Sequence, residues 1–139
     1  MSDAVREAKR HLMRAGLLSG APDEGVVPDL ILRSWRRSIG NSADSTLPSQ
    51  KFDEIDTGSI VARRASDRGL QRKLDRVNAA EGFDYSEDSI GTNGLGTSMV
   101  EGRAVYIEGS QHFNESLSVL ACAAVPVYTP SGLVIGSVS

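Results

Sequence analysis

The stretch SEDSIGTNGLGTSMVEG, residues 86–102, is the most informative part of the chain. It holds four glycines, three serines and two threonines among few apolar residues. In a free helix each glycine costs about 1 kcal/mol relative to alanine. Glycine also lets a helix approach a sheet closely, because it has no side chain to hold the backbones apart. We therefore predict a short helix over about 93–100, capped by Asn93, with Gly94 or Gly96 against a sheet.

Two phosphate-binding motifs share part of this spacing. Gly91 and Gly96 are spaced as in a P-loop, but Thr97 stands where that motif needs the lysine that pairs with the phosphate charge. A dinucleotide fingerprint that starts at Gly94 needs a glycine where Met99 stands, and no predicted strand leads into it. We therefore expect neither phosphate site. The remaining functional interpretation is a pocket for a small ligand between the helix and the sheet.

Composition limits the classes of function. A length of 139 residues fits one domain with a helical appendage, and 40% apolar residues suffice for one core. The net charge of −3 argues against direct nucleic-acid contact, because phosphates are neutralised by basic surfaces. The single cysteine, Cys122, allows neither an intramolecular disulfide nor a cysteine zinc cluster, and we expect no metal or cofactor. We find no secretory segment and no apolar run long enough to span a bilayer, so we expect a reduced, cytoplasmic protein.

Apolar periodicity predicts three helices and a strand in the first part of the chain. The N-terminal helix has an apolar stripe of Val5, Ala8, Leu12, Ala15 and Leu18. In the second helix Pro28 suits the first turn, Gly40 suits the end, and Leu32, Trp35 and Ile39 share a face. The expected elements are a helix over 2–18, a helix within 26–40, a half-buried strand over 59–66, and a helix over 66–78 capped by Ser66.

The C-terminal part favours strands. We expect a strand over 103–109, a helical turn capped by Ser110, and two apolar strands over 119–128 and 133–139. The linking TPSG is typical of an antiparallel hairpin, because proline and glycine suit a short turn. Mixed helices and adjacent antiparallel strands predict an α+β fold with helices on one side of the sheet.

The order of these motifs resembles a known family. YSEDSIGTNGLGTSMVEGRAVYIEGSQHF (85–113) and CAAVPVYTPSGLVIGSV (122–138) are similar to the GAF-type sensor domain of bacterial transcriptional regulators of the acetoin and glycerol/dihydroxyacetone catabolism group. SWRRS (34–38) resembles the N-terminal SW-x-R segment of that group. The resemblance covers roughly 26–40 and 56–139. It implies a GAF-like antiparallel sheet with flanking helices, a small-molecule effector, and an output domain that these residues do not contain.

The same resemblance suggests a domain organisation. We expect an N-terminal helical segment for dimerisation and signalling over 1–40, a linker over 41–55 and the GAF-like sensor over 56–139. The family places a helix and its first strand in the interval that includes 41–55, which is short for both. Either the sheet lacks its first strand or these residues supply it. Gln111 stands where the family usually has glutamate, and Tyr85 where tryptophan is common.

Seven residues are predicted to surround the effector. Polar groups at the start of the glycine-rich helix would fix the ligand, and apolar groups from the strands would line its pocket. His112 could instead be structural, and Cys122 a buried, inert thiol. The predicted ligand-binding residues are Tyr85, Thr92, Asn93, Thr97, His112, Phe113 and Cys122.

Three functions follow from these observations. The first is a dimeric ligand-sensing domain of a transcription regulator, with no catalytic residues. The second is a GAF-type enzyme that reduces a sulfoxide, although one cysteine cannot form the catalytic disulfide. The third is a dimerisation module without a ligand. The dimer would pair helices 2–18 and 28–39, and the alternative is that helix 2–18 folds back on its own domain.

Overall fold

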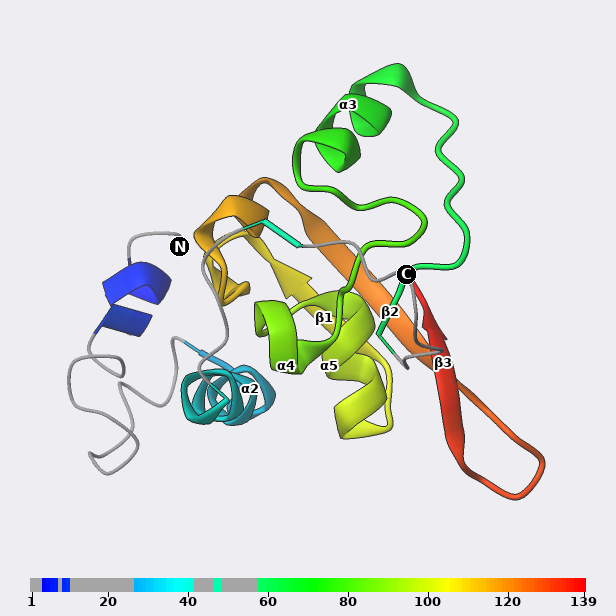
Figure 1. The fold of residues 1–139 in the computed structure, drawn as a ribbon. Helices are drawn as coiled ribbons and strands as arrows, with labels where there is room; N and C mark the ends of the chain where they lie inside the picture. Colours follow the sequence, from blue (N-terminus) through cyan, green and yellow to red (C-terminus); the bar gives the residue numbers. More distant parts are fainter. Residues whose placement is uncertain (1–3, 8, 11–26, 42–46, 49–57) are drawn as a thin grey trace.

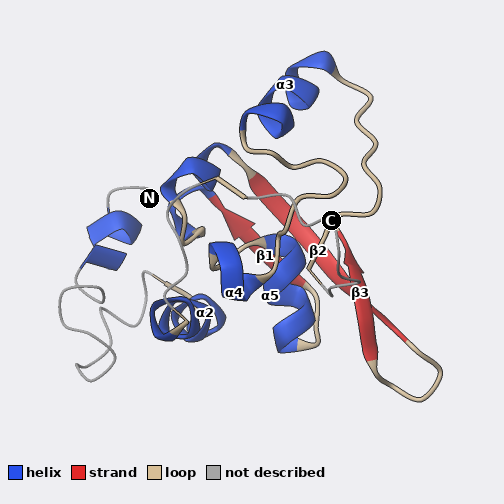
Figure 2. Ribbon diagram, viewed as in Figure 1, coloured by secondary structure: helices blue, strands red, loops and turns tan. Residues whose placement is uncertain are grey.

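The centre of the molecule is a three-stranded antiparallel sheet in the order β1-β2-β3. A computed structural model describes residues 4–7, 9–10, 27–41, 47–48 and 58–139. The strands are β1 Val105–Glu108, β2 Ala121–Tyr128 and β3 Val134–Val138. The sheet and its covering helices form the expected α+β arrangement (Figures 1 and 2).

The C-terminal hairpin forms as predicted. Val125 lies opposite Val138, and the Leu133 carbonyl accepts a hydrogen bond from the Thr129 amide across the turn. Gly132 has a φ of +90°, a backbone conformation that glycine adopts without strain. On the other side of β2, Ile107 of β1 lies opposite Cys122.

The glycine-rich helix packs on the sheet as expected. α5, Gly94–Glu101, is capped by Asn93, whose side chain accepts a 2.9 Å hydrogen bond from the Gly96 amide. A Cβ on Gly94 would lie 2.8 Å from the Cβ of Cys122 in β2. A Cβ on Gly96 would lie 2.5 Å from the Glu87 amide nitrogen. Gly94 therefore permits the approach to the sheet, whereas Gly96 permits the approach to the preceding segment.

α2, Asp29–Gly40, supplies the largest buried side chain. Pro28 occupies the N-cap position, one residue before the first turn where it was expected. Trp35 is fully buried and shares a core with Leu32, Val105 and Ile107, while Ile39 packs at its margin. The predicted apolar face of this helix is confirmed, and it joins α2 directly to β1.

The N-terminal helix is described at residues 4–7, 9 and 10. Val5 is buried in the same core as α2 and β1, and Lys9 is buried beside it. The described part therefore folds back on its own domain, which is the alternative to the dimer interface named above. Leu12, Ala15 and Leu18 lie outside the described residues.

The predicted strand over 59–66 is wrong. Ser59 forms a single bridge with Asp84, and the residues after it have no regular structure. Val61 is 89% exposed. The loose alternation in this segment has no partner strand among the described residues, and a strand pattern needs such a partner to be satisfied.

α3, Arg68–Arg76, forms where the periodicity predicts it but in a different setting. Asp67 caps it, not Ser66, because the Asp67 carboxylate accepts from the Leu70 amide. No residue of α3 is buried, so this helix does not cover the sheet, as Figure 1 shows. Leu74 of α3 packs at the margin of a second core, whose buried members are Val77, Ala79, Tyr85, Ile90, Leu117 and Leu120.

Short helical turns complete the covering layer. α4, Glu87–Ile90, precedes α5, and two 3₁₀ turns, η2 Gly109–Gln111 and η3 Glu115–Val119, link β1 to β2. Ser110 lies inside η2 and does not cap it, so that prediction is wrong. The cap of η3 is Asn114, whose side chain accepts from the Ser116 amide.

The sheet face opposite α5 is apolar and exposed at Tyr106, Val125 and Val138. Most of the interval 41–55, where a first strand was considered, lies outside the described residues. Within the described residues no helix is long and apolar enough to cross a membrane.

Candidate functional site

A buried carboxylate links α2 to the glycine-rich segment. Glu87, at the start of α4, is almost fully buried and pairs with Arg37 of α2 at 2.6 Å between Oε1 and Nε. Arg37 also reaches Glu101 at the end of α5, at 2.7 Å. The hydrogen bond to Glu87 raises the pKa of Arg37, and Arg33, also on α2, lowers the pKa of Glu101. Two arginines of α2 thus hold both ends of the α4–α5 segment.

Three buried hydroxyls complete the contact. Ser34 of α2 donates to Glu87 Oε2 at 2.7 Å and lies 2.5 Å from the Thr92 hydroxyl. The Thr97 hydroxyl donates to the same carboxylate oxygen at 2.8 Å. We call Ser34, Arg37, Glu87, Thr92 and Thr97 the Glu87 network. Buried polar groups are stabilising only when they are paired, and each of these is paired.

Asn93 and Tyr85 bind the backbone. Asn93 donates from Nδ2 to the carbonyls of Tyr85 and Gly91, both at 2.9 Å. The Tyr85 hydroxyl donates to the Val77 carbonyl at 2.7 Å, and burial raises its pKa. Each side chain therefore has protein partners for its polar atoms.

His112 is different, because one of its ring nitrogens has no partner. The ring is fully buried, and Nδ1 lies 2.9 Å from the Gly109 carbonyl. Nε2 has no hydrogen bond within the described part of the chain. Burial lowers the pKa of His112 to about 4, so the ring is neutral at pH 7. Since a carbonyl only accepts, Nδ1 carries the proton and Nε2 presents a lone pair.

The turn that carries His112 is held from two sides. Trp35 of α2 donates from Nε1 to the Gln111 carbonyl at 2.7 Å. Lys9 of the N-terminal helix lies 3.1 Å from the Ser110 carbonyl and 2.7 Å from the His112 carbonyl. Lys9 also pairs with Glu115 at 2.6 Å, and burial lowers the Lys9 pKa. The 109–113 turn is therefore bound to both α2 and the N-terminal helix.

Phe113 and Cys122 border the glycine-rich segment. The Phe113 amide donates to the Thr92 carbonyl, and a Cβ on Gly91 would lie 2.6 Å from the Phe113 Cβ. Cys122 lies under Gly94, and burial raises its thiol pKa. The thiol is consequently a weak nucleophile.

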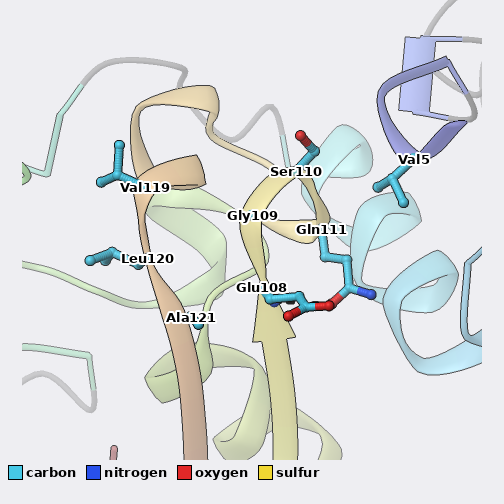
Figure 3. A pocket seen from close by; sticks show the side chains of 8 residues that line it. All are labelled: Val5, Glu108, Gly109, Ser110, Gln111, Val119, Leu120 and Ala121. Atoms are coloured by element: carbon cyan, nitrogen blue, oxygen red, sulfur yellow. Dashed lines mark hydrogen bonds between the residues drawn. The ribbon is translucent and has the colours of Figure 1, made fainter. Parts of the chain in front are cut away.

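Tyr85, Phe113 and Cys122 thus lie against the start of α5, which carries Thr92, Asn93 and Thr97, while the His112 ring is held within the adjoining 109–113 turn. A hollow with a volume of about 380 Å³ lies in the described part of the chain, and none of the seven residues lines it. That hollow is lined by Val5, Glu108, Gly109, Ser110, Gln111, Val119, Leu120 and Ala121 (Figure 3). Gln111 contributes to it, and its neighbour His112 does not.

Sequence reasoning missed Ser34, Arg37, Glu87 and Lys9. The first three could have been found by considering two motifs together. SWRRS (34–38) supplies the hydroxyl and the guanidinium, and SED (86–88) supplies the carboxylate that they bind. Nothing in the sequence indicated that Lys9 is buried, since it lies on the charged face of its helix. Among the described residues no group of histidine, cysteine, aspartate and glutamate side chains is arranged to hold a metal ion.

Comparison with known families identifies the domain. The profile described as the MimR N-terminal domain matches residues 36–138, which is most of the chain. The chain belongs to this family. The match runs from the last turn of α2 to β3. It includes all seven predicted ligand residues and every member of the Glu87 network except Ser34.

Named relatives of this MimR-type domain are regulators. The propane 2-monooxygenase operon transcriptional activator MimR of Mycolicibacterium smegmatis is 42% identical over 73 residues, 52% of this chain and 12% of that protein. The acetoin dehydrogenase operon transcriptional activator AcoR of Bacillus subtilis is 30% identical over 79 residues, 57% of this chain and 13% of that protein. The predicted resemblance to acetoin-type regulators is confirmed, and this chain spans about an eighth of each relative's length.

A solved structure confirms the fold. The E. coli DhaR(N)–DhaL complex contains a chain that superposes with a TM-score of 0.66 at 20% identity, over 78% of this chain and 50% of that one. This similarity supports the α+β, GAF-like architecture of the MimR-type domain.

Proposed function

We propose that this chain is the ligand-sensing regulatory domain of a bacterial transcription activator. One observation carries the proposal. α2 makes buried contacts with both segments that bear the predicted ligand residues, through the Glu87 network and through Trp35 on the Gln111 carbonyl. A ligand that moved either segment would change the packing of α2, because buried polar contacts do not stretch continuously.

The effector site proposed here consists of Tyr85, Thr92, Asn93, Thr97, His112, Phe113 and Cys122. Thr92, Asn93 and Thr97 already have protein partners, so they shape the site more than they bind the ligand. Among these seven residues, His112 Nε2 is the buried side-chain atom without a hydrogen-bond partner in the described chain. As a lone-pair acceptor it calls for a ligand with a hydroxyl or N–H donor. Among the small polyols, diketones and aromatic compounds suggested by the family resemblance, this favours hydroxyl-bearing compounds.

The enzyme alternative is less well supported. The named relatives are transcriptional activators. Cys122 is the single cysteine, and burial raises its pKa, which disfavours the thiolate. We therefore propose a non-catalytic domain that works without a cofactor in the cytoplasm. Direct contact with nucleic acid would fall to another part of the regulator.

A dimerisation module without a ligand is the second candidate, because the sheet face around Tyr106, Val125 and Val138 is apolar and exposed. Thermal unfolding in the presence of a metabolite panel separates the two candidates. A bound ligand raises the midpoint by mass action, by an amount that grows with ligand concentration. We expect at least one hydroxyl-bearing compound to do so, and a diketone of the same carbon skeleton to do less.

The control for that screen is the His112→Phe variant, which keeps an aromatic ring and removes both the Nε2 acceptor and the Nδ1 donor to the Gly109 carbonyl. We expect it to fold and to lose the ligand-dependent rise. A panel without a single concentration-dependent shift for the wild-type chain would favour the module without a ligand.

A further inference from the structure

We infer that the hollow between the N-terminal helix and the end of β1 binds a small organic cation, namely a protonated primary amine with a short alkyl chain. This site is separate from the proposed effector site, because none of the seven effector residues lines it. The volume of about 380 Å³ lies within the range of small-ligand pockets.

The apolar part of the hollow comes from two separate segments. Val5 projects into it from the N-terminal helix, and Val119, Leu120 and Ala121 line it from the end of η3 and the start of β2. Val119 is 55% exposed, so its side chain forms a rim that an alkyl chain can cover. Covering exposed apolar surface is favourable at about 25 cal/mol per Å².

The polar part is a preorganised carboxylate. Glu108 accepts from the Gln111 amide, and the Gln111 Oε1 accepts from the Glu108 amide at 3.0 Å, so the two side chains fix each other. The Tyr106 hydroxyl donates to Glu108 Oε2 at 3.1 Å. Figure 3 shows the two side chains adjacent at the end of β1.

Charge decides the class of ligand. Glu108 is the single charged residue that lines the hollow, and within the described chain no lysine or arginine pairs with it. Lys9, the nearby buried cation, is occupied by Glu115 and by backbone carbonyls. An ammonium group would supply the missing counter-charge, and charge-assisted hydrogen bonds to a carboxylate are stronger than neutral ones. An anionic ligand would be repelled.

The test uses three probes that share one alkyl chain: n-butylammonium, 1-butanol and butyrate. Amide chemical shifts of the ¹⁵N-labelled 139-residue chain are followed by NMR during titration at pH 7. We expect saturable shifts at Gly109, Ser110, Gln111 and Ala121 with n-butylammonium, binding about tenfold weaker with 1-butanol, and none with butyrate. A tenfold ratio corresponds to about 1.4 kcal/mol, the scale of one charged hydrogen bond.

Two variants and one control make the result specific. E108Q should reduce the affinity for n-butylammonium to that for 1-butanol, and V119W should block both probes by filling the rim. E7Q makes the same chemical change on an exposed glutamate of the adjacent helix and should leave the titration unchanged. Equal binding of butyrate, shifts that never saturate, or an E108Q variant that binds n-butylammonium as the wild type does would each overturn the inference.

Discussion

Glu87 is the side chain on which the contact between α2 and the glycine-rich segment depends. Its carboxylate is buried and accepts from Ser34, Arg37 and Thr97. Removing one partner of a buried ion pair leaves an uncompensated charge, which typically costs about 3–5 kcal/mol. We therefore expect Glu87→Gln to lower the free energy of unfolding by about 3 kcal/mol in urea denaturation.

Asp88→Asn is the matched control for this change. Asp88 is the next residue of α4, is exposed, and accepts a 3.0 Å hydrogen bond from the Asn41 side chain. Surface substitutions of this kind usually stay within about 0.5 kcal/mol. Similar losses for the two variants would show that the Glu87 network does not stabilise the fold.

His112 gives the fold a defined response to acid. Burial holds its pKa at about 4 in the folded chain, below the usual 6.5. Because the unfolded chain then binds more protons, the stability that the neutral ring contributes is complete above pH 6.5 and is lost as pH falls toward 4. The loss is on the order of 3 kcal/mol.

The pH series is compared with that of His112→Asn, whose amide can still donate to the Gly109 carbonyl. Lys9 and the carboxylates are present in both proteins, so their contributions to the pH series cancel in the comparison. We expect the variant to lose the extra slope between pH 6.5 and 4. Parallel curves for the two proteins would mean that His112 does not titrate in a buried setting.

Which residues are buried was only partly predictable from the sequence. Thr92, Asn93 and Thr97 could be singled out, because hydroxyl and amide groups beside glycines suggest caps. Their partners could not, since Ser34 and Glu87 are 53 positions apart and neither lies in an apolar pattern. A buried ion pair is set by how two helices meet, which local periodicity does not encode.

α5 combines poor helix propensity with close packing, and this predicts an unusual response to alanine. Gly94→Ala gains about 1 kcal/mol of helix propensity. Its Cβ would nevertheless lie 2.8 Å from the Cβ of Cys122, and overpacking costs typically 1–3 kcal/mol. We expect a net loss of about 1 kcal/mol in thermal or urea unfolding.

Gly96→Ala should be more damaging, because its Cβ would meet the Glu87 amide nitrogen at 2.5 Å and the Tyr85 carbonyl oxygen at 2.6 Å. Gly136→Ala in β3 is the control, since a Cβ there meets nothing within 4 Å. The predicted order of stability is Gly136→Ala, then Gly94→Ala, then Gly96→Ala. Any other order would contradict the packing described for α5.

The docking of the N-terminal helix rests on Lys9. Lys9→Met keeps a long apolar stem and removes the donor to the Ser110 and His112 carbonyls. Leaving a buried acceptor without a hydrogen bond lowers the free energy of unfolding by about 1–3 kcal/mol. We expect faster hydrogen exchange at residues 109–113 in the variant. Arg10→Met, on an exposed arginine that pairs with Glu7, should leave that exchange unchanged.

Elements were predictable where periodicity and turn chemistry agreed. α2 and the β2–β3 hairpin combine an apolar pattern with glycine or proline at their ends, and α5 combines glycine spacing with the Asn93 cap. All three form near the expected positions. The segment 59–66 showed alternation without turn signals or a partner strand, and it is irregular. α3 forms where it was predicted, but its exposure could not be foreseen, because apolar residues at helical spacing do not show what the helix will face.

The assembly of the whole chain remains a prediction. Val5 and Lys9 are turned into the domain, so a dimer through the N-terminal segment would use other surfaces of it. We expect the intact chain to sediment as a dimer and a chain that lacks residues 1–20 to sediment as a monomer, with circular dichroism as the check on folding. Monomers at high concentration in both cases would contradict the proposed dimer.

The central claim is that a small molecule binds near His112 and that its binding changes the packing of α2. The most direct measurement is an amide NMR titration of the intact chain with a hydroxyl-bearing compound that raises its unfolding midpoint. We predict saturable shifts at residues 109–113 and at the start of α5, accompanied by shifts at Ser34, Trp35 and Arg37, with the α2 shifts suppressed in Thr97→Val. Shifts that spare α2, or that lie in neither of the two ligand-bearing segments, would contradict the account.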